Sequence, residues 1–186
     1  MTTQTITHLT LEALKQGLPH IQNAPADAGE LALIVARPAT DERTVLETAI
    51  LTPENGLEGD GWRERGSRHS PDGSALLDAQ ITIMNTRTAQ LIAQSEERWA
   101  LAGDQLYVDM DLSPGNLPPG QRIQLGTAVL EITAQEHRGC LKFAQRFGKD
   151  ALKFVNQDGW PLRLRGIYAK VVQAGTIQVG DRLLKQ

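Results

Sequence analysis

The sequence predicts a mainly β fold: a closed β-barrel with a few peripheral helices and a helical extension at the N-terminus. Three observations support this fold class. Short apolar runs recur after residue 30, and most are separated by turns that contain glycine. Residues 106–112 alternate apolar and polar side chains, as a half-buried strand does. Helical periodicity is confined to two or three short segments.

The expected strands run from residue 31 almost to the C-terminus. They cover residues 31–36, 44–51, 80–84, 106–112, 122–125, 128–133, 164–173, 176–179 and 182–184. The pair 122–125 and 128–133 forms a hairpin around Gly126.

The expected helices are short and have recognisable ends. Thr10 caps a first helix, which Gly17 and the following Pro19 end. Asn85 caps a second helix over residues 86–94, and a third covers residues 141–147. The chain therefore divides into a helical extension with its linker, residues 1–29, and a barrel domain, residues 30–186.

Composition excludes several classes of function. Aromatic residues make up 4% of the 186 residues, too few for a surface that stacks single-stranded nucleic acid. The longest apolar run, residues 31–36, is too short to span a membrane. The N-terminal residues lack the basic and apolar regions of a secretory signal, and a single cysteine cannot form an internal disulfide. We expect a cytoplasmic protein that binds neither nucleic acid nor membrane.

The charge is unevenly distributed along the chain. The formal net charge is −3, but residues 1–136 carry −10 and residues 137–186 carry +7. Clustered like charges attract ligands of opposite sign. Because the basic part begins beside the only cysteine, Cys140, the pattern predicts an anionic small-molecule ligand there.

Cys140 is the first candidate for chemistry. A thiol acts as a nucleophile or sulfur acceptor only as the thiolate, which nearby cations favour. His137, Arg138 and Lys142 are the local candidates for that effect. The alternative is a buried structural cysteine, since free cysteines are often buried. Three roles are open for His137: it could orient the thiol, bind an anion or cap the end of a strand.

Other candidates lie earlier in the chain. A loop with Arg63, Arg65, Arg68 and His69 could clamp a phosphate or carboxylate, or be a solvated charged loop. A zinc site of His69, His137 and Cys140 is a weaker hypothesis, because no ligand spacing supports it.

Two further polar residues lie in glycine-rich turns. Asp60 either caps its turn or contacts a ligand. Asn116 either contacts a ligand or adopts the left-handed conformation of a turn.

The order of these motifs resembles that of a known family. The motifs are the Gly-x-x-Gly-Asp turn at 56–60, His69, the Gly-Asn-Leu turn at 115–117, the hairpin with Gly126, Cys140, and the final stretch 165–181. Together they resemble the MOSC domain, named for the C-terminal domain of molybdenum cofactor sulfurase. The resemblance covers about residues 30 to 184 and is closest to the small stand-alone bacterial members.

The resemblance implies both a fold and a role. The fold would be a barrel like the barrel domain of pyruvate kinase. Cys140 would carry sulfur as a persulfide or ligate the molybdenum of a pterin cofactor, and Asp60, His69 and Asn116 fall on the ligand-facing motifs of the family. From their chemistry and charge we expect His137 as the catalytic partner of Cys140, and Arg138, Arg63 and Lys142 as further residues that bind the cofactor.

The activity implied is sulfur transfer or a molybdenum-dependent oxidation or reduction. The sulfur donor would be a separate cysteine desulfurase, because the chain has no domain of its own that binds pyridoxal phosphate. The alternative is a non-catalytic module that binds an anionic small molecule, with Cys140 structural.

Overall fold

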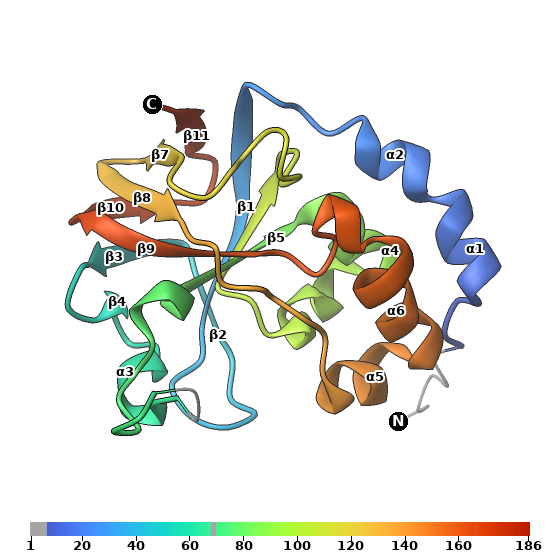
Figure 1. Cartoon of the computed structure of the whole chain (residues 1–186), viewed down its shortest axis with the longest axis horizontal. Coiled ribbons are helices and arrows are strands. Elements are labelled where there is room, and N and C mark those ends of the chain that lie inside the picture. The colour runs from blue at the N-terminus through green and yellow to red at the C-terminus, as the bar shows by residue number, and fades with distance from the viewer. Residues whose placement is uncertain (1–6, 68–69) are drawn as a thin grey trace.

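The computed structural model describes residues 7–67 and 70–186. Seven strands close into a barrel in the order β11, β7, β8, β9, β5, β6 and β1, with β1 pairing back to β11 (Figure 1). The strands are β1 (Ala28–Ala36), β5 (Ile81–Asn85), β6 (Leu106–Asp109), β7 (Arg122–Leu125), β8 (Ala128–Ile132), β9 (Ile167–Gln173) and β11 (Arg182–Lys185). Only β5 and β6 pair in parallel within this ring. The predicted closed barrel is confirmed.

Four further strands lie outside this closed ring. The strand β2 (Thr44–Leu46) pairs with β1, whereas β10 (Gly175–Gln178), β3 (Thr48–Thr52) and β4 (Gly56–Leu57) form a separate sheet. The prediction of a single strand over residues 44–51 is therefore wrong. The chain leaves the barrel sheet at Glu47, where its carbonyl accepts a hydrogen bond from Val179, and enters the second sheet.

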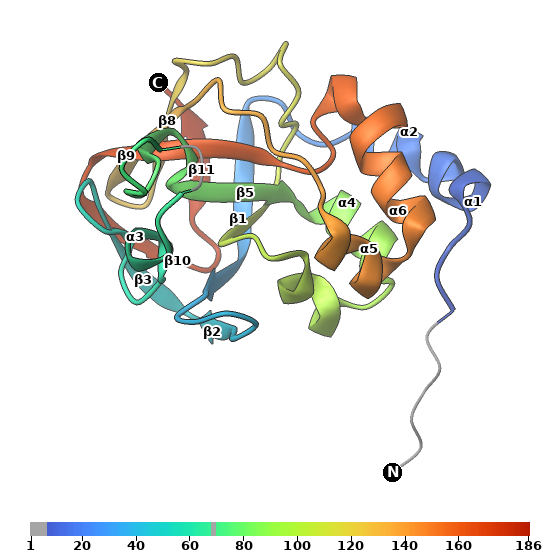
Figure 2. The same cartoon turned by 60° about the horizontal axis from the view of Figure 1, so that its bottom comes forward.

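Helices are more numerous than the two or three that the sequence predicts. The described residues include α1 (Leu11–Gln16), α2 (Leu18–Gln22), α3 (Trp62–Arg65), α4 (Thr86–Ala93), α5 (Leu141–Phe147) and α6 (Lys149–Lys153). Short 3-10 helices are η1 (Leu77–Ala79), η2 (Glu96–Ala102) and η4 (Trp160–Leu162), and η3 (Phe154–Asp158) is a π-helix. Except for α3, the α-helices gather on one side of the barrel (Figures 1 and 2).

The helix ends show which predicted helix boundaries are correct and which are wrong. Thr10 Oγ1 accepts from the N–H of Ala13, and Asn85 Oδ1 accepts from Arg87 and Thr88, so both predicted caps are confirmed. Pro19 does not end the helical region. It lies in the first turn of α2, where its missing N–H is tolerated.

The molecule has two apolar cores. One fills the barrel and includes Leu106 and Val108, while the other lies between the barrel wall and the helices and includes Tyr107. Successive residues of β6 therefore point to opposite faces, as the alternation predicts. Helix α5 packs Phe143 and Phe147 into the second core, which fixes the segment that carries Cys140 against the barrel.

Candidate anion-binding site around Cys140

A cleft of about 450 Å³ opens beside Cys140. Its volume is in the range of small-molecule sites. The cations that line it are Arg37, Arg43, Arg65, Arg138, Lys142, Arg146 and Arg165. Among the described residues of this lining, Asp41 is the one carboxylate. A second cavity of about 550 Å³ shares Arg37, Arg65 and Arg138 with the cleft, so the positive surface continues beyond it.

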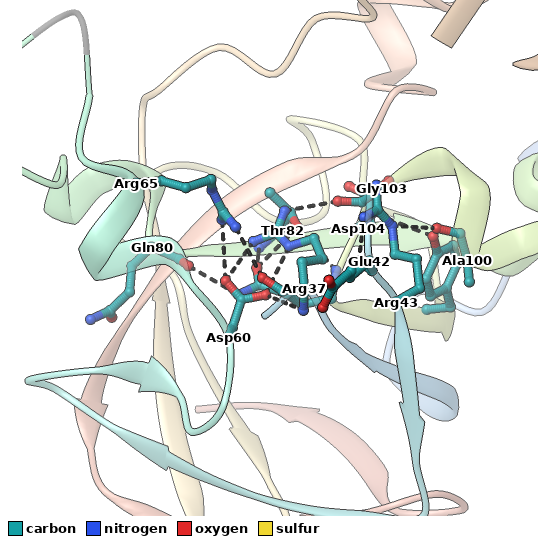
Figure 3. A network of polar contacts seen from close by, with 12 residues as sticks. Arg37, Glu42, Arg43, Asp60, Arg65, Gln80, Thr82, Ala100, Gly103 and Asp104 are labelled. Atoms are coloured by element: carbon teal, nitrogen blue, oxygen red, sulfur yellow. Dashed lines mark hydrogen bonds and ion pairs between the residues drawn. The ribbon is translucent and has the colours of Figure 1, made fainter. Parts of the chain in front are cut away.

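Asp60 holds two of these arginines in place. Its side chain is fully buried and accepts from the Arg37 backbone N–H at 2.8 Å, from Arg37 Nε at 2.8 Å and from Arg65 Nη2 at 3.2 Å (Figure 3). Arg37 directly follows β1 and Arg65 ends α3, so Asp60 ties two elements together. Asp60 thus orients guanidinium groups that line the cleft, a role that the sequence does not reveal.

A second buried carboxylate lies beneath the cleft. Asp104 accepts from Arg165 Nη1 at 2.6 Å, and its other oxygen lies 3.6 Å from His137 Nδ1. Burial raises the pKa of Asp104, although Arg165 beside it favours the ionised form. Asp104 Oδ1, His137 Nδ1 and Arg165 Nε have no hydrogen-bond partner among the described residues. Such unsatisfied buried groups carry a free-energy cost and are often found at functional sites.

His137 is a neutral imidazole in this environment. Burial lowers its pKa well below 6.5, and the positive charges of Arg165 and Arg37 act in the same direction. Its ring lies 4.4 Å from that of Tyr168, measured between centroids. The pKa of Tyr168 is raised, mainly by burial. His137 is therefore positioned to exchange hydrogen bonds rather than to add a positive charge to the cleft.

Cys140 lies at the rim of the cleft and is exposed to solvent. The alternative of a buried cysteine is therefore wrong. Asn156, in the π-helix, fixes the preceding residue: its side chain accepts from the Gly139 N–H at 2.8 Å and donates to the Gly139 carbonyl at 3.0 Å. A Cβ at Gly139 would lie 2.7 Å from Leu152 Cδ1, so a larger residue there would have to displace the end of the Leu152 side chain.

The helix after Cys140 contributes two more cations. Lys142 Nζ lies 3.1 Å from both oxygens of Asp41, and Arg146 Nη2 lies 2.7 Å from one of them. Arg138 has different partners: its guanidinium carbon lies 3.8 Å from the Trp160 ring centroid, and its Nε donates to Glu136. Arg138 nevertheless lines the cleft with its neighbours.

Other predicted site residues do not lie in the cleft. Arg63 donates to Asn55 Oδ1 and lines a different cavity of about 320 Å³. Asn116 donates to the carbonyls of Ala26 and Asp111 and accepts from Lys185, so it ties loops together.

Asn116 also lacks the left-handed backbone that was the alternative to a ligand contact. Among the described non-glycine residues, only Asp41, Gln94 and Arg163 have positive φ. His69 and Arg68 lie outside the described residues.

Sequence reasoning missed several residues that the cleft brings together, above all Arg37, Arg43, Arg165 and Asp104. Arg37 and Arg165 flank buried strands, so a charge at the end of an apolar run was the available signal. No local pattern marks Asp104, whose partners are 33 and 61 residues away in the sequence.

Comparison with known proteins decides the family. The model of the MOSC domain matches residues 66–184 of the chain. The chain belongs to the MOSC domain family. No match was found among curated proteins. Within this MOSC protein, Cys140, His137 and Arg165 fall inside the matched region, whereas Arg37, Arg43, Asp60 and Arg65 precede it.

Solved structures with the same fold support the architecture of this MOSC protein. The YuaD protein of Bacillus subtilis is 13% identical with a TM-score of 0.63, covering 84% of this chain and 94% of that one. YiiM of Escherichia coli is 18% identical with a TM-score of 0.55, covering 84% and 69%. YiiM of Geobacillus stearothermophilus is 17% identical with a TM-score of 0.54, covering 85% and 75%. At these identities the similarity shows the fold.

Among the described residues of this MOSC protein, no three or more His, Cys, Asp or Glu side chains gather closely enough to hold a metal ion, and His69 of the zinc hypothesis is not one of the described residues. No described helix has the length and apolar character needed to cross a membrane.

Proposed function

We propose that the cleft binds the molybdenum cofactor through its anionic groups and that Cys140 supplies the protein sulfur of the site. The observation that carries the proposal is the exposed thiol at the rim of a cleft lined by seven cationic side chains. Membership of the MOSC family, which is associated with this cofactor, supports it.

The residues present suit such a ligand. Guanidinium groups bind phosphate with two parallel hydrogen bonds, and Asp60 holds Arg37 and Arg65 ready for that contact. His137 and Arg165 also line the cleft, each with a buried nitrogen that has no hydrogen-bond partner among the described residues. When bound, the cofactor would supply the redox chemistry of molybdenum. The chain itself would bind, orient and shield the ligand.

Sulfur transfer is a second role that the same thiol could have. Because Cys140 is exposed, the persulfide of a separate donor protein can reach it. The Cys140 thiolate would attack the outer sulfur of that persulfide. The donor S–S bond breaks, a new S–S bond forms on Cys140, and the donor leaves as a thiolate, so no net oxidation occurs. A cysteine desulfurase is the class of donor that fits this step.

Cofactor binding is tested by anaerobic titration of the purified full chain with isolated molybdenum cofactor, followed by pterin fluorescence after gel filtration. The wild type should retain pterin, and Arg65→Gln should retain less because it loses a cleft cation. Arg63→Gln is the matched control, since Arg63 lines a different cavity. Equal retention by both variants, or none by the wild type, would contradict the proposal.

Sulfur transfer has a separate readout. After incubation with a desulfurase and cysteine, intact mass spectrometry should show one added sulfur atom on the wild type and none on Cys140→Ser. The alternative of a non-catalytic anion-binding module predicts no added sulfur and no retained pterin, but still binding of simple anions.

A further inference from the structure

The outer end of the cleft is occupied by a carboxylate of the protein itself. Asp41 lies in the loop between β1 and β2 and accepts from Lys142 Nζ at 3.1 Å and from Arg146 Nη2 at 2.7 Å. Both donors lie on α5, the helix that follows Cys140, more than 100 residues along the chain. The contact thus joins a surface loop to the segment that carries the thiol.

One carboxylate does not neutralise the cations gathered there. Arg43 also lines this end of the cleft and donates hydrogen bonds to the backbone carbonyls of Glu42 and Ala100. The pKa of Arg43 is lowered by burial and by the charges of Arg146 and Arg37. This end of the cleft therefore remains net positive with Asp41 in place, and a more highly charged anion would be held better.

Asp41 is bound in a way that allows displacement. Its side chain is 57% exposed, as is typical of ion pairs that contribute little net stability. Its backbone φ of 63° lies in the left-handed region, which an L-residue other than glycine adopts at some cost in free energy. Release of Asp41 from the cations would let this loop relax.

We propose that Lys142, Arg146 and Arg43 form a binding position for the phosphate group of an organic phosphate, which Asp41 fills in the free protein and the phosphate displaces. The inference deepens the proposed function and rests on it only for the identity of the ligand. A phosphate monoester carries about −1.5 to −2 charge and three acceptor oxygens, against −1 and two oxygens for Asp41. Because both anions need the same donors, their binding is mutually exclusive.

Calorimetric titration with methyl phosphate tests the competition. Asp41→Asn weakens the internal competitor, so the affinity for methyl phosphate should rise about three- to tenfold. This is the gain expected when one or two exposed ion pairs no longer have to be broken before the ligand binds. Asp27→Asn is the matched control, because Asp27 is fully exposed and pairs only loosely with Lys185, at 3.9 Å. Arg146→Gln should weaken binding.

Three results would overturn the inference. They are unchanged or weaker methyl phosphate binding in Asp41→Asn, an equal gain in Asp27→Asn, and binding of inorganic phosphate without binding of methyl phosphate. The last result would mean that the position takes the free ion rather than an organic phosphate.

Hydrogen–deuterium exchange gives a second readout on the wild type. Added methyl phosphate should increase exchange in residues 38–42, which it releases, and decrease exchange in α5. Slower exchange in residues 38–42 would show that Asp41 stays in place and would contradict the displacement.

The test is independent of the thiol and the metal. The gain from Asp41→Asn should persist in a Cys140→Ser background. If that gain is found but no pterin is retained, this inference stands and the cofactor proposal falls. If pterin is retained without the gain, the cofactor proposal stands and this inference falls.

Discussion

Replacing Asp60 by Asn removes the buried counter-ion of two cleft arginines. The Asp60 side chain is 0% exposed, and that of Arg37 is 13% exposed, so this pair is largely desolvated. Removing one partner of a buried pair typically lowers the free energy of unfolding by about 3 to 5 kcal/mol. Arg65 adds little to this estimate, because its side chain is 39% exposed and water screens its charge.

The assay is urea unfolding followed by circular dichroism, with thermal unfolding as a check. For a chain of this size, the loss corresponds to a fall in melting temperature of about 6 to 20 °C. Asp109→Asn is the matched control, because Asp109 also binds an arginine fork, at 2.7 and 3.1 Å from Arg87, but is 37% exposed. The control should lose about 1 kcal/mol or less. Equal losses in the two variants would refute the reasoning.

Two further predictions concern the segment around the thiol. Asn156→Ala leaves the N–H and the carbonyl of Gly139 without their partners, so urea unfolding should show a loss of about 1 to 3 kcal/mol. Asn156→Asp should not restore this stability, because its second carboxylate oxygen would face the Gly139 carbonyl, which is also an acceptor. Unchanged stability of the Ala variant would speak against this account. His137, whose pKa is lowered in the folded protein, binds a proton more readily when unfolded, so stability should fall as pH drops below 6.5, by up to about 1.4 kcal/mol per pH unit. His137→Gln should flatten this part of the stability curve, and an unchanged slope would contradict the assignment.

Much of the fold could be predicted because local patterns determine it. The hairpin of β7 and β8 follows from two alternating runs around Gly126, whose φ of 55° suits the turn. Asn85 as the cap of α4 follows from its side-chain chemistry. The break between β2 and β3 could not be predicted, because residues 44–51 contain no glycine or proline to interrupt the run, and tertiary pairing alone divides it.

The site was only partly predictable, for a related reason. Cys140, Arg138 and Lys142 are neighbours in the sequence, so their shared position near the cleft was visible. Arg37 and Asp60 are 23 residues apart and come together only in the folded chain, so no short motif connects this ion pair. Arg63 was predicted from its charge and Asn116 from its place in a family motif, but their side chains bind neighbouring loops instead.

The most direct test of the central proposal is the molybdenum content of the full chain purified from cells that make the cofactor. The wild type should contain close to one molybdenum and one pterin per chain. Cys140→Ser should lose most of the molybdenum, while a folded Arg63→Gln should retain it. Wild-type protein with neither molybdenum nor pterin, or Cys140→Ser with undiminished molybdenum, would contradict the proposal that Cys140 supplies the protein sulfur of a cofactor site.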